Sequence, residues 1–176
     1  MDTLKYPIGQ FNWAEDVPLD QIGVLLVQLE ALPRLLANAV KDLTSEQLDS
    51  SYRPGGWTIR QVVHHIADAH MNAYIRFKLA LTEENPIIKP FEEALWAELA
   101  DSKTLSVDVS LKLIDALHTR WVILIKSLSL EQLAKCFRHP EAGDLSLKKA
   151  LGLYAWHGNH HLAHITNYRT SIGLDD

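Results

Sequence analysis

Apolar residues along most of the chain recur at intervals of three and four positions, which is the spacing of an amphipathic α-helix. The pattern predicts four long helices, over residues 19–42, 58–84, 110–128 and 146–172. Pro33 falls inside the first of these segments. We expect a kink or a break there, because proline lacks the N–H group that the interior of a helix needs.

Capping residues mark where several helices should begin. Thr58 and Gln61 stand three positions apart in TIRQ, the spacing of a capping box, so a long helix should start at Thr58. Short helical turns are expected after Thr44 or Ser45 and again after Ser129, since these hydroxyl side chains are good N-caps.

The remaining segments are short. A shorter helix is predicted over 91–99 and a loop over 139–144, strand signals are few, and Gly173 is placed to end the last helix. Four long helices with short additional helices predict an all-α protein folded as a four-helix bundle. Because the chain shows no internal boundary, residues 1–176 should form a single domain.

Histidines are concentrated in the last predicted helix, where WHGNHHLAHI holds four of the nine in the chain. At about 100° per residue, all four fall on one stripe of the helix. Buried imidazoles need partners for their nitrogens, and a metal ion is one solution. Side chains at i and i+4 are neighbours on a helix, so two pairs can each present two imidazoles to one cation: His157 with His161, and His160 with His164.

The helix predicted from residue 58 carries a polar stripe on an otherwise apolar sequence, consisting of His65 with Gln61, Asp68, Asn72 and Arg76. His65 can supply a third ligand, since three protein ligands and an open position are usual in catalytic zinc sites. The other polar side chains could instead form an interhelical salt-bridge network. The isolated His118 and His139 are expected to be ordinary hydrogen-bonded core residues.

Composition and charge narrow the range of partners. The 22 acidic side chains outnumber the 17 basic ones, which gives a net charge of −5 and argues against nucleic acid or anionic membrane as a partner. We expect neither a signal peptide nor an apolar run long enough to span a membrane. Cys136 is the single cysteine, so a reducing, cytoplasmic compartment is expected.

Three segments resemble the DinB-like superfamily, and specifically its YfiT-type branch: YPIGQF near the N-terminus, YRPGGWTIRQVVHHIADAHMNAYIRFKLALTEE at 52–84 and LGLYAWHGNHHLAHI at 151–165. The resemblance implies a four-helix bundle that binds one divalent metal through three histidines, one from the second long helix and two from the last. Zinc and nickel are the expected ions, because both bind imidazole nitrogen well.

Carried over residue by residue, the resemblance makes His65, His160 and His164 the metal ligands. It leaves His157 and His161 with supporting or packing roles.

The resemblance also implies an enzyme, either a metal-dependent hydrolase or a thiol S-transferase. The S-transferase would join a low-molecular-weight thiol such as bacillithiol to an electrophile through a metal-bound thiolate. A divalent ion on three neutral imidazoles lowers the pKa of a bound water or thiol, so both chemistries fit. We favour thiol transfer, with the thiol brought by the substrate, because Cys136 lies far from the ligand motifs in the sequence.

Asp68, Asn72 and Arg76 are the candidate catalytic residues. Asp68 can orient an imidazole or take a proton, and Arg76 can hold an anionic part of the substrate. A non-catalytic metal-binding bundle is the remaining alternative, and it would need a fourth protein ligand such as Asp68 or His161. The expected partners are a small-molecule thiol and an electrophile, with no nucleic acid and no membrane, and the chain is expected to form a homodimer.

Overall fold

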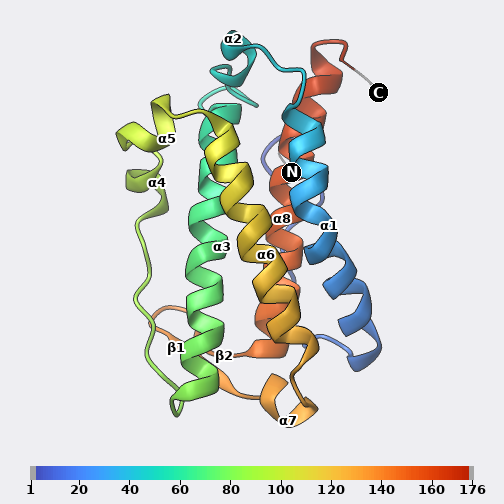
Figure 1. The fold of residues 1–176 in the computed structure, drawn as a ribbon, viewed down its shortest axis with the longest axis vertical. Helices are drawn as coiled ribbons and strands as arrows, with labels where there is room; N and C mark the ends of the chain where they lie inside the picture. Colours follow the sequence, from blue (N-terminus) through green and yellow to red (C-terminus); the bar gives the residue numbers. More distant parts are fainter. Residues whose placement is uncertain (1–2, 175–176) are drawn as a thin grey trace.

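The structure, a computed structural model, describes residues 3–174 of the predicted domain; residues 1–2 and 175–176 lie outside the described part. Its body consists of four long helices (Figure 1): α1 (Ile22–Val40), α3 (Ile59–Thr82), α6 (Val107–Lys126) and α8 (Leu147–Ser171). The predicted all-α four-helix bundle is thereby confirmed.

The four helices are connected in an order that is not simply up and down. α1 and α3 lie diagonally opposite, and each packs against both α6 and α8. α1 and α8 run in one direction while α3 and α6 run in the other (Figure 1). The chain must therefore return along the whole bundle between α3 and α6, and this crossover contains α4 (Glu93–Trp96) and α5 (Ala100–Thr104).

The predicted caps are present where the helices begin. Thr58 Oγ accepts from the backbone N–H of Gln61 at 3.1 Å, and the Gln61 side chain accepts from the Thr58 N–H at 2.9 Å. The same reciprocal pair caps α2 (Ser45–Leu48) at Thr44. These local bonds fix the start of α3, the helix that carries His65.

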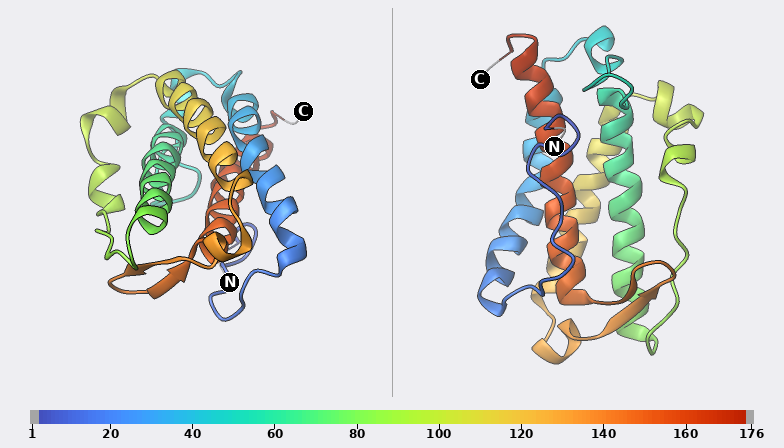
Figure 2. Two further views of the ribbon diagram at one scale, coloured as in Figure 1. Left: turned by 60° about the horizontal axis from the view of Figure 1, so that its bottom comes forward. Right: turned by 180° about the vertical axis from the view of Figure 1, so that it is seen from behind.

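Two short elements follow α6 where the sequence predicted a turn and a loop. α7 (Leu130–Leu133) is capped by Ser129 as expected. The chain then forms an antiparallel hairpin of β1 (Cys136–His139) and β2 (Gly143–Ser146), which lies across one end of the bundle (Figure 2). Strands of four residues are too short to show a period in the sequence, so the hairpin was not predicted.

Pro33 neither ends nor interrupts α1, which is one continuous helix over its whole length. A proline removes the hydrogen bond to the carbonyl four residues earlier, here that of Leu29. This carbonyl instead accepts from Nδ1 of His118 at 2.7 Å. The expected break is absent, and a side chain from another helix satisfies the carbonyl group that proline leaves without its helical partner.

The apolar core is divided into two clusters along the bundle. One surrounds Trp121, near the hairpin, and the other surrounds Ile66, nearer the opposite end. On each long helix the residues of one cluster give way to those of the other along the sequence. Histidines lie at the changeover on three of the helices: His70 on α3, His118 on α6, and His157 and His161 on α8.

The first helical segment, η1 (Leu19–Gln21) with α1, is long and apolar enough to cross a membrane by length and composition alone. This corrects the expectation that no apolar run reaches that length. Core helices pass the same test, and here Leu29, Leu32 and Leu36 are buried in a helix that packs against α6 and α8. Core packing therefore accounts for these three leucines, whereas Leu19, Val24 and Val27 in the same segment are exposed.

We expect Thr58→Ala to lower the free energy of unfolding by about 1 kcal/mol, because an N-cap threonine typically contributes about that much. Urea denaturation followed by circular dichroism measures the change. Thr44→Ala removes the same capping box from the four-residue α2 and is the matched control. Its expected loss is smaller because α2 buries little, and a Thr58→Ala protein as stable as the wild type would contradict the role of the cap.

Candidate metal centre

Three histidine side chains, one from α3 and two from α8, meet inside the bundle. One ring nitrogen from each of His65, His157 and His161 lies within 4.8 Å of the other two. Nε2 of His65 is 3.1 Å from Nε2 of His157. Two nitrogens bound to one tetrahedral zinc ion are about 3.3 Å apart, so this spacing suits such an ion. Among residues 3–174, this is the one group of at least three His, Cys, Asp or Glu side chains arranged to hold a metal.

These rings are held in the neutral form, which is the form that binds metal. Burial, together with the neighbouring imidazole of His160, lowers the pKa of His65 to about 4. Burial and the surrounding imidazoles lower the pKa values of His157 and His161 well below 6.5. Three neutral imidazoles without a carboxylate are a donor set for zinc, nickel and similar ions rather than for magnesium or calcium.

The structure does not place His160 and His164 in this group, although the resemblance had indicated them as ligands. All four histidines of α8 share one broad stripe, but only the pair His157 and His161 lies level with His65. A helical wheel cannot separate two i, i+4 pairs on the same stripe, because that choice depends on how α3 and α8 are aligned along the bundle. In the structure, the two α8 histidines grouped with His65 are therefore His157 and His161 rather than His160 and His164.

His164 instead lies behind His161. Its Nδ1 is 3.3 Å from Nδ1 of His161, and its Nε2 is 3.2 Å from the carbonyl oxygen of Lys5. The ring also stacks on Tyr52, with centroids 4.0 Å apart. This side of α8 is covered by the N-terminal segment, which runs along the helix (Figure 2).

His160 faces the same N-terminal segment. Its ring stacks on Trp156 with centroids 4.7 Å apart, and Tyr6 lies at 6.1 Å. Its buried Nδ1 has no hydrogen-bond partner among the described residues. The structure thus gives His160 an aromatic environment outside the three-histidine group.

Gly158 allows a close helix contact beside the group. A Cβ atom at this position would lie 2.4 Å from a methyl carbon of Leu32 on α1, and 3.4 Å from Cε1 of His70 on α3. Any larger residue would push these side chains away from α8. The glycine between His157 and His161 therefore lets two other helices approach the site.

The predicted catalytic residues of α3 do not form a salt-bridge network. The Asn72 side chain donates to the backbone carbonyl of Asp68 at 2.9 Å, and Arg76 donates to the hydroxyl of Tyr154 at 2.8 Å. Within residues 3–174 no carboxylate pairs with Arg76. Burial, with a smaller effect of the nearby Asp101 carboxylate, raises the pKa of Asp68 to about 6.

Arg76 lines a cavity of about 290 Å³ near the hairpin, and none of the three grouped histidines is among its lining residues. Tyr154 connects the two, because it lines the cavity and its ring centroid lies 6.5 Å from that of His157. Most of the other walls are apolar: Trp13, Phe137, Ala142, Leu145 and Leu153, with His139 and Glu141 at the hairpin. The cavity suits a small molecule that carries both an apolar part and an anionic group.

Comparison with known proteins identifies the family. The sequence pattern described as the DinB superfamily matches residues 28–165. The chain belongs to the DinB superfamily. A Bacillus cereus strain B4264 protein named "Putative metal-dependent hydrolase" is 58% identical to this DinB-superfamily chain, over 98% of the chain and 99% of the relative. A protein from Bacillus thuringiensis subsp. konkukian has a name of the same form, the same identity and the same coverage.

Solved structures agree with this assignment. YfiT from Bacillus subtilis, described as "a probable metal-dependent hydrolase with an unusual four-helix bundle topology", matches with a TM-score of 0.94 and 48% identity, covering 98% of this chain and 99% of YfiT. TT2238, a four-helix bundle protein, matches with a TM-score of 0.56 and 21% identity over 80% of this chain and 94% of TT2238, and shows the fold alone. The resemblance to the DinB superfamily seen in the sequence is confirmed.

The histidines also make the stability of the metal-free DinB-superfamily protein depend on pH. All nine have a lowered pKa, with burial as the largest cause. Below about pH 6.5 the unfolded chain therefore binds more protons than the folded one. The free energy of unfolding consequently decreases as the pH is lowered. Asp68 has a raised pKa and acts in the opposite sense, but it is one group against nine.

We expect the urea midpoint, measured with a chelator present, to be clearly lower at about pH 5 than at about pH 7, since each titrating histidine contributes up to about 1.4 kcal/mol per pH unit. Between about pH 7 and pH 8 the midpoint should stay constant, which is the internal control. A midpoint that rises toward pH 5 would show that the histidines are not buried in the neutral form.

Proposed function

We propose that this chain is a metal-dependent enzyme that transfers a low-molecular-weight thiol to an electrophile, with His65, His157 and His161 holding one zinc or nickel ion. The observation that carries the proposal is the group of three neutral imidazoles, which among the described residues has no fourth protein ligand. A divalent ion bound there supplies a Lewis acid that lowers the pKa of a coordinated thiol or water. The names of the Bacillus relatives support the metal dependence.

The cavity that Arg76 and Tyr154 line is suited to the thiol substrate. Arg76 has no carboxylate ion-pair partner in residues 3–174, and most walls of the cavity other than His139 and Glu141 are apolar, so a charged hydrogen bond there is strong. Arg76 is therefore available for a carboxylate of the thiol. Tyr154 holds the guanidinium group in place through its hydroxyl.

Asp68 is the candidate proton acceptor. It follows His65 by three residues, so both side chains project from the same face of α3. A pKa of about 6 lets this carboxyl group take up and release a proton near neutral pH. In the proposed reaction a sulfur–carbon bond forms, the bond to the leaving group breaks and its electron pair leaves with that group, and Asp68 takes the thiol proton.

The nucleophilic sulfur is brought by the substrate rather than by the protein. Cys136 lies in the hairpin and is not part of the histidine group. Burial, together with the nearby Asp144 carboxylate, raises the pKa of its thiol. A thiol with a raised pKa is a poor nucleophile at neutral pH.

Hydrolysis is the second candidate function, and the names of the relatives favour it. A metal-dependent hydrolase would use the same three histidines and the same cavity, with water in place of the thiol. Asp68 would then take a proton from water, and Arg76 would bind an anionic group of the molecule that is cleaved.

The ligand assignment can be tested on two adjacent residues. We expect His161→Ala to lose bound zinc, whereas His160→Ala keeps it, because the first ring belongs to the group and the second stacks on Trp156. Elemental analysis of the purified variants measures metal per chain. Both are buried histidines on α8, so the pair is matched. A His160→Ala protein without metal beside a fully loaded His161→Ala protein would restore the pair indicated by the resemblance.

The choice between the two reactions needs an assay of the metal-loaded protein. Bacillithiol and cysteine are tested with a chromogenic aryl chloride, and a panel of esters and amides is tested without thiol. Consumption of thiol and aryl chloride in equal amounts supports transfer. Cleavage of an ester or amide, with no thiol consumed in the first assay, supports the hydrolase.

We expect Arg76→Leu to raise the KM for bacillithiol by about tenfold or more, since a hydrogen bond to a charged group contributes about 1.5–3 kcal/mol. Metal content should not change, because Arg76 is outside the histidine group. Arg76→Lys keeps the charge and should recover part of the loss. An Arg76→Leu enzyme with an unchanged KM would contradict the proposed role of the cavity.

A further inference from the structure

Hydrogen bonds join three histidines, His157, His70 and His118, in a line that ends on a backbone carbonyl of α1. Nδ1 of His157 lies 3.2 Å from Nε2 of His70, and Nδ1 of His70 lies 2.8 Å from Nε2 of His118. Nδ1 of His118 lies 2.7 Å from the carbonyl oxygen of Leu29. The line therefore passes through all four long helices, and the two histidines that are not in the metal group, His70 and His118, are 0% and 1% exposed.

Because the line ends on a carbonyl oxygen, it determines which nitrogen of each ring carries the proton. A carbonyl oxygen can only accept a hydrogen bond, so Nδ1 of His118 carries a proton. In a neutral ring Nε2 of His118 then has no proton and must accept a hydrogen bond. His70 then donates from Nδ1 and accepts at Nε2 for the same reason. Nδ1 of His157 is left as the donor to His70, so Nε2 of His157 has no proton and keeps its lone pair.

That lone pair is the one the metal group requires. Nε2 of His157 is the atom that lies 3.1 Å from Nε2 of His65. A histidine binds metal through an unprotonated nitrogen, and a hydrogen bond from its other nitrogen sets which one that is. The opposite tautomer would direct an N–H bond at the ion.

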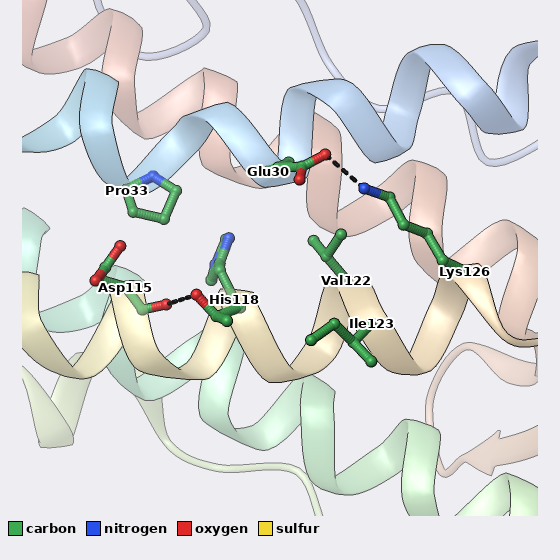
Figure 3. Close-up of a pocket in the computed structure, with 8 residues that line it drawn as sticks. Glu30, Pro33, Asp115, His118, Val122, Ile123 and Lys126 are labelled. Carbon is green, nitrogen blue, oxygen red and sulfur yellow. Dashed lines mark hydrogen bonds and ion pairs between the residues drawn. The ribbon is translucent and has the colours of Figure 1, made fainter.

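Pro33 leaves the Leu29 carbonyl, on which the line ends, without a donor from its own helix. Its missing N–H removes the helical hydrogen bond to Leu29, so the carbonyl of Leu29 is left for His118. Figure 3 shows the His118 ring directed from α6 toward α1, close to Pro33. A surface cavity of about 200 Å³ lies on this side, but His118 remains 1% exposed, so water has little access to compete for the carbonyl.

A second and shorter line has the same form. Nε2 of His164 lies 3.2 Å from the carbonyl oxygen of Lys5, and Nδ1 of His164 lies 3.3 Å from Nδ1 of His161. Since the Lys5 carbonyl can only accept, Nε2 of His164 donates to it and Nδ1 of His164 accepts from Nδ1 of His161. Nε2 of His161 is then left without a proton. Both metal-group histidines of α8 are thus held by lines that end on backbone carbonyls.

We infer that His118 and His70 are positioning residues, which set the tautomer of His157 and keep its Nε2 ready to bind the ion, with Pro33 freeing the carbonyl that anchors them. The inference rests on the proposed metal site. It gives a function to His118, which the sequence indicated only as an ordinary core residue, and to a proline in the middle of a helix.

Two measurements on the full chain test the inference. Nitrogen-15 NMR of the histidine side chains in metal-free protein reports which nitrogen of His157 carries the proton, and we expect Nδ1. Competition with a chelator then gives the affinity for Zn²⁺. We expect His118→Leu to lose the single tautomer of His157 and to bind Zn²⁺ about 10–100-fold more weakly, the usual effect of removing a group that orients a ligand.

Three further variants complete the test. His118→Gln keeps an acceptor for His70 and should recover most of the affinity. His64→Leu is the matched control, since His64 is a buried histidine bound to Ser110 and to the Leu105 carbonyl outside the line, and its affinity should be unchanged. Pro33→Ala restores a competing N–H without altering a histidine, so it decides the matter if His118→Leu fails to fold; we expect weaker Zn²⁺ binding.

Two results would overturn the inference. One is a proton on Nε2 of His157 in the metal-free wild type. The other is a folded His118→Leu or Pro33→Ala protein with the wild-type tautomer and affinity. A wild type that binds no Zn²⁺ but carries the expected tautomer would instead count against the proposed function and leave the histidine line in place.

Discussion

The structure depends on placing uncharged imidazoles in the interior of a helical bundle. A buried polar group without a partner costs roughly 1–3 kcal/mol, so most of the ring nitrogens are satisfied by a neighbour, and the buried Nδ1 of His160 is an exception among the described residues. His70 and His118 meet this requirement with each other and with a backbone carbonyl, and His64 does so with Ser110 and Leu105. The layer between the two apolar clusters holds His70, His118, His157 and His161, and the clusters around Trp121 and around Ile66 stabilise the bundle.

The irregular segments enclose this layer, and the connectivity of the bundle places one of them there. Parallel α3 and α6 require a crossover, and that crossover lies beside the metal group: Phe91 is 6.5 Å from the His65 ring, and the Ala97 carbonyl accepts from Gln61 at 2.8 Å. The N-terminal segment covers α8 in a similar way through Lys5. Four bare helices would expose the imidazoles to water, which would raise their pKa values toward those of free histidine and weaken metal binding.

Local chemistry was predictable from the sequence, and alignment between helices was not. The caps at Thr58, Thr44 and Ser129, and the polar stripe that contains His65, follow from spacing within a few residues. The choice between His157 with His161 and His160 with His164 depends on the level at which α3 meets α8, which no single helix encodes. The resemblance to the DinB superfamily predicted the fold correctly, yet it could not replace that geometric information when four histidines lie within eight positions.

Pro33 shows how a violation of a local rule can carry information about a distant site. In the interior of a helix proline costs about 3 kcal/mol or more, in part because one carbonyl loses its partner. That cost is reduced here because His118 donates to the Leu29 carbonyl, and the same bond begins the line of donors that ends at His157. From the sequence, the proline predicts only a break and His118 only a core residue. Each becomes intelligible when the other is adjacent, because a carbonyl with no helical donor and an imidazole with no local acceptor satisfy each other.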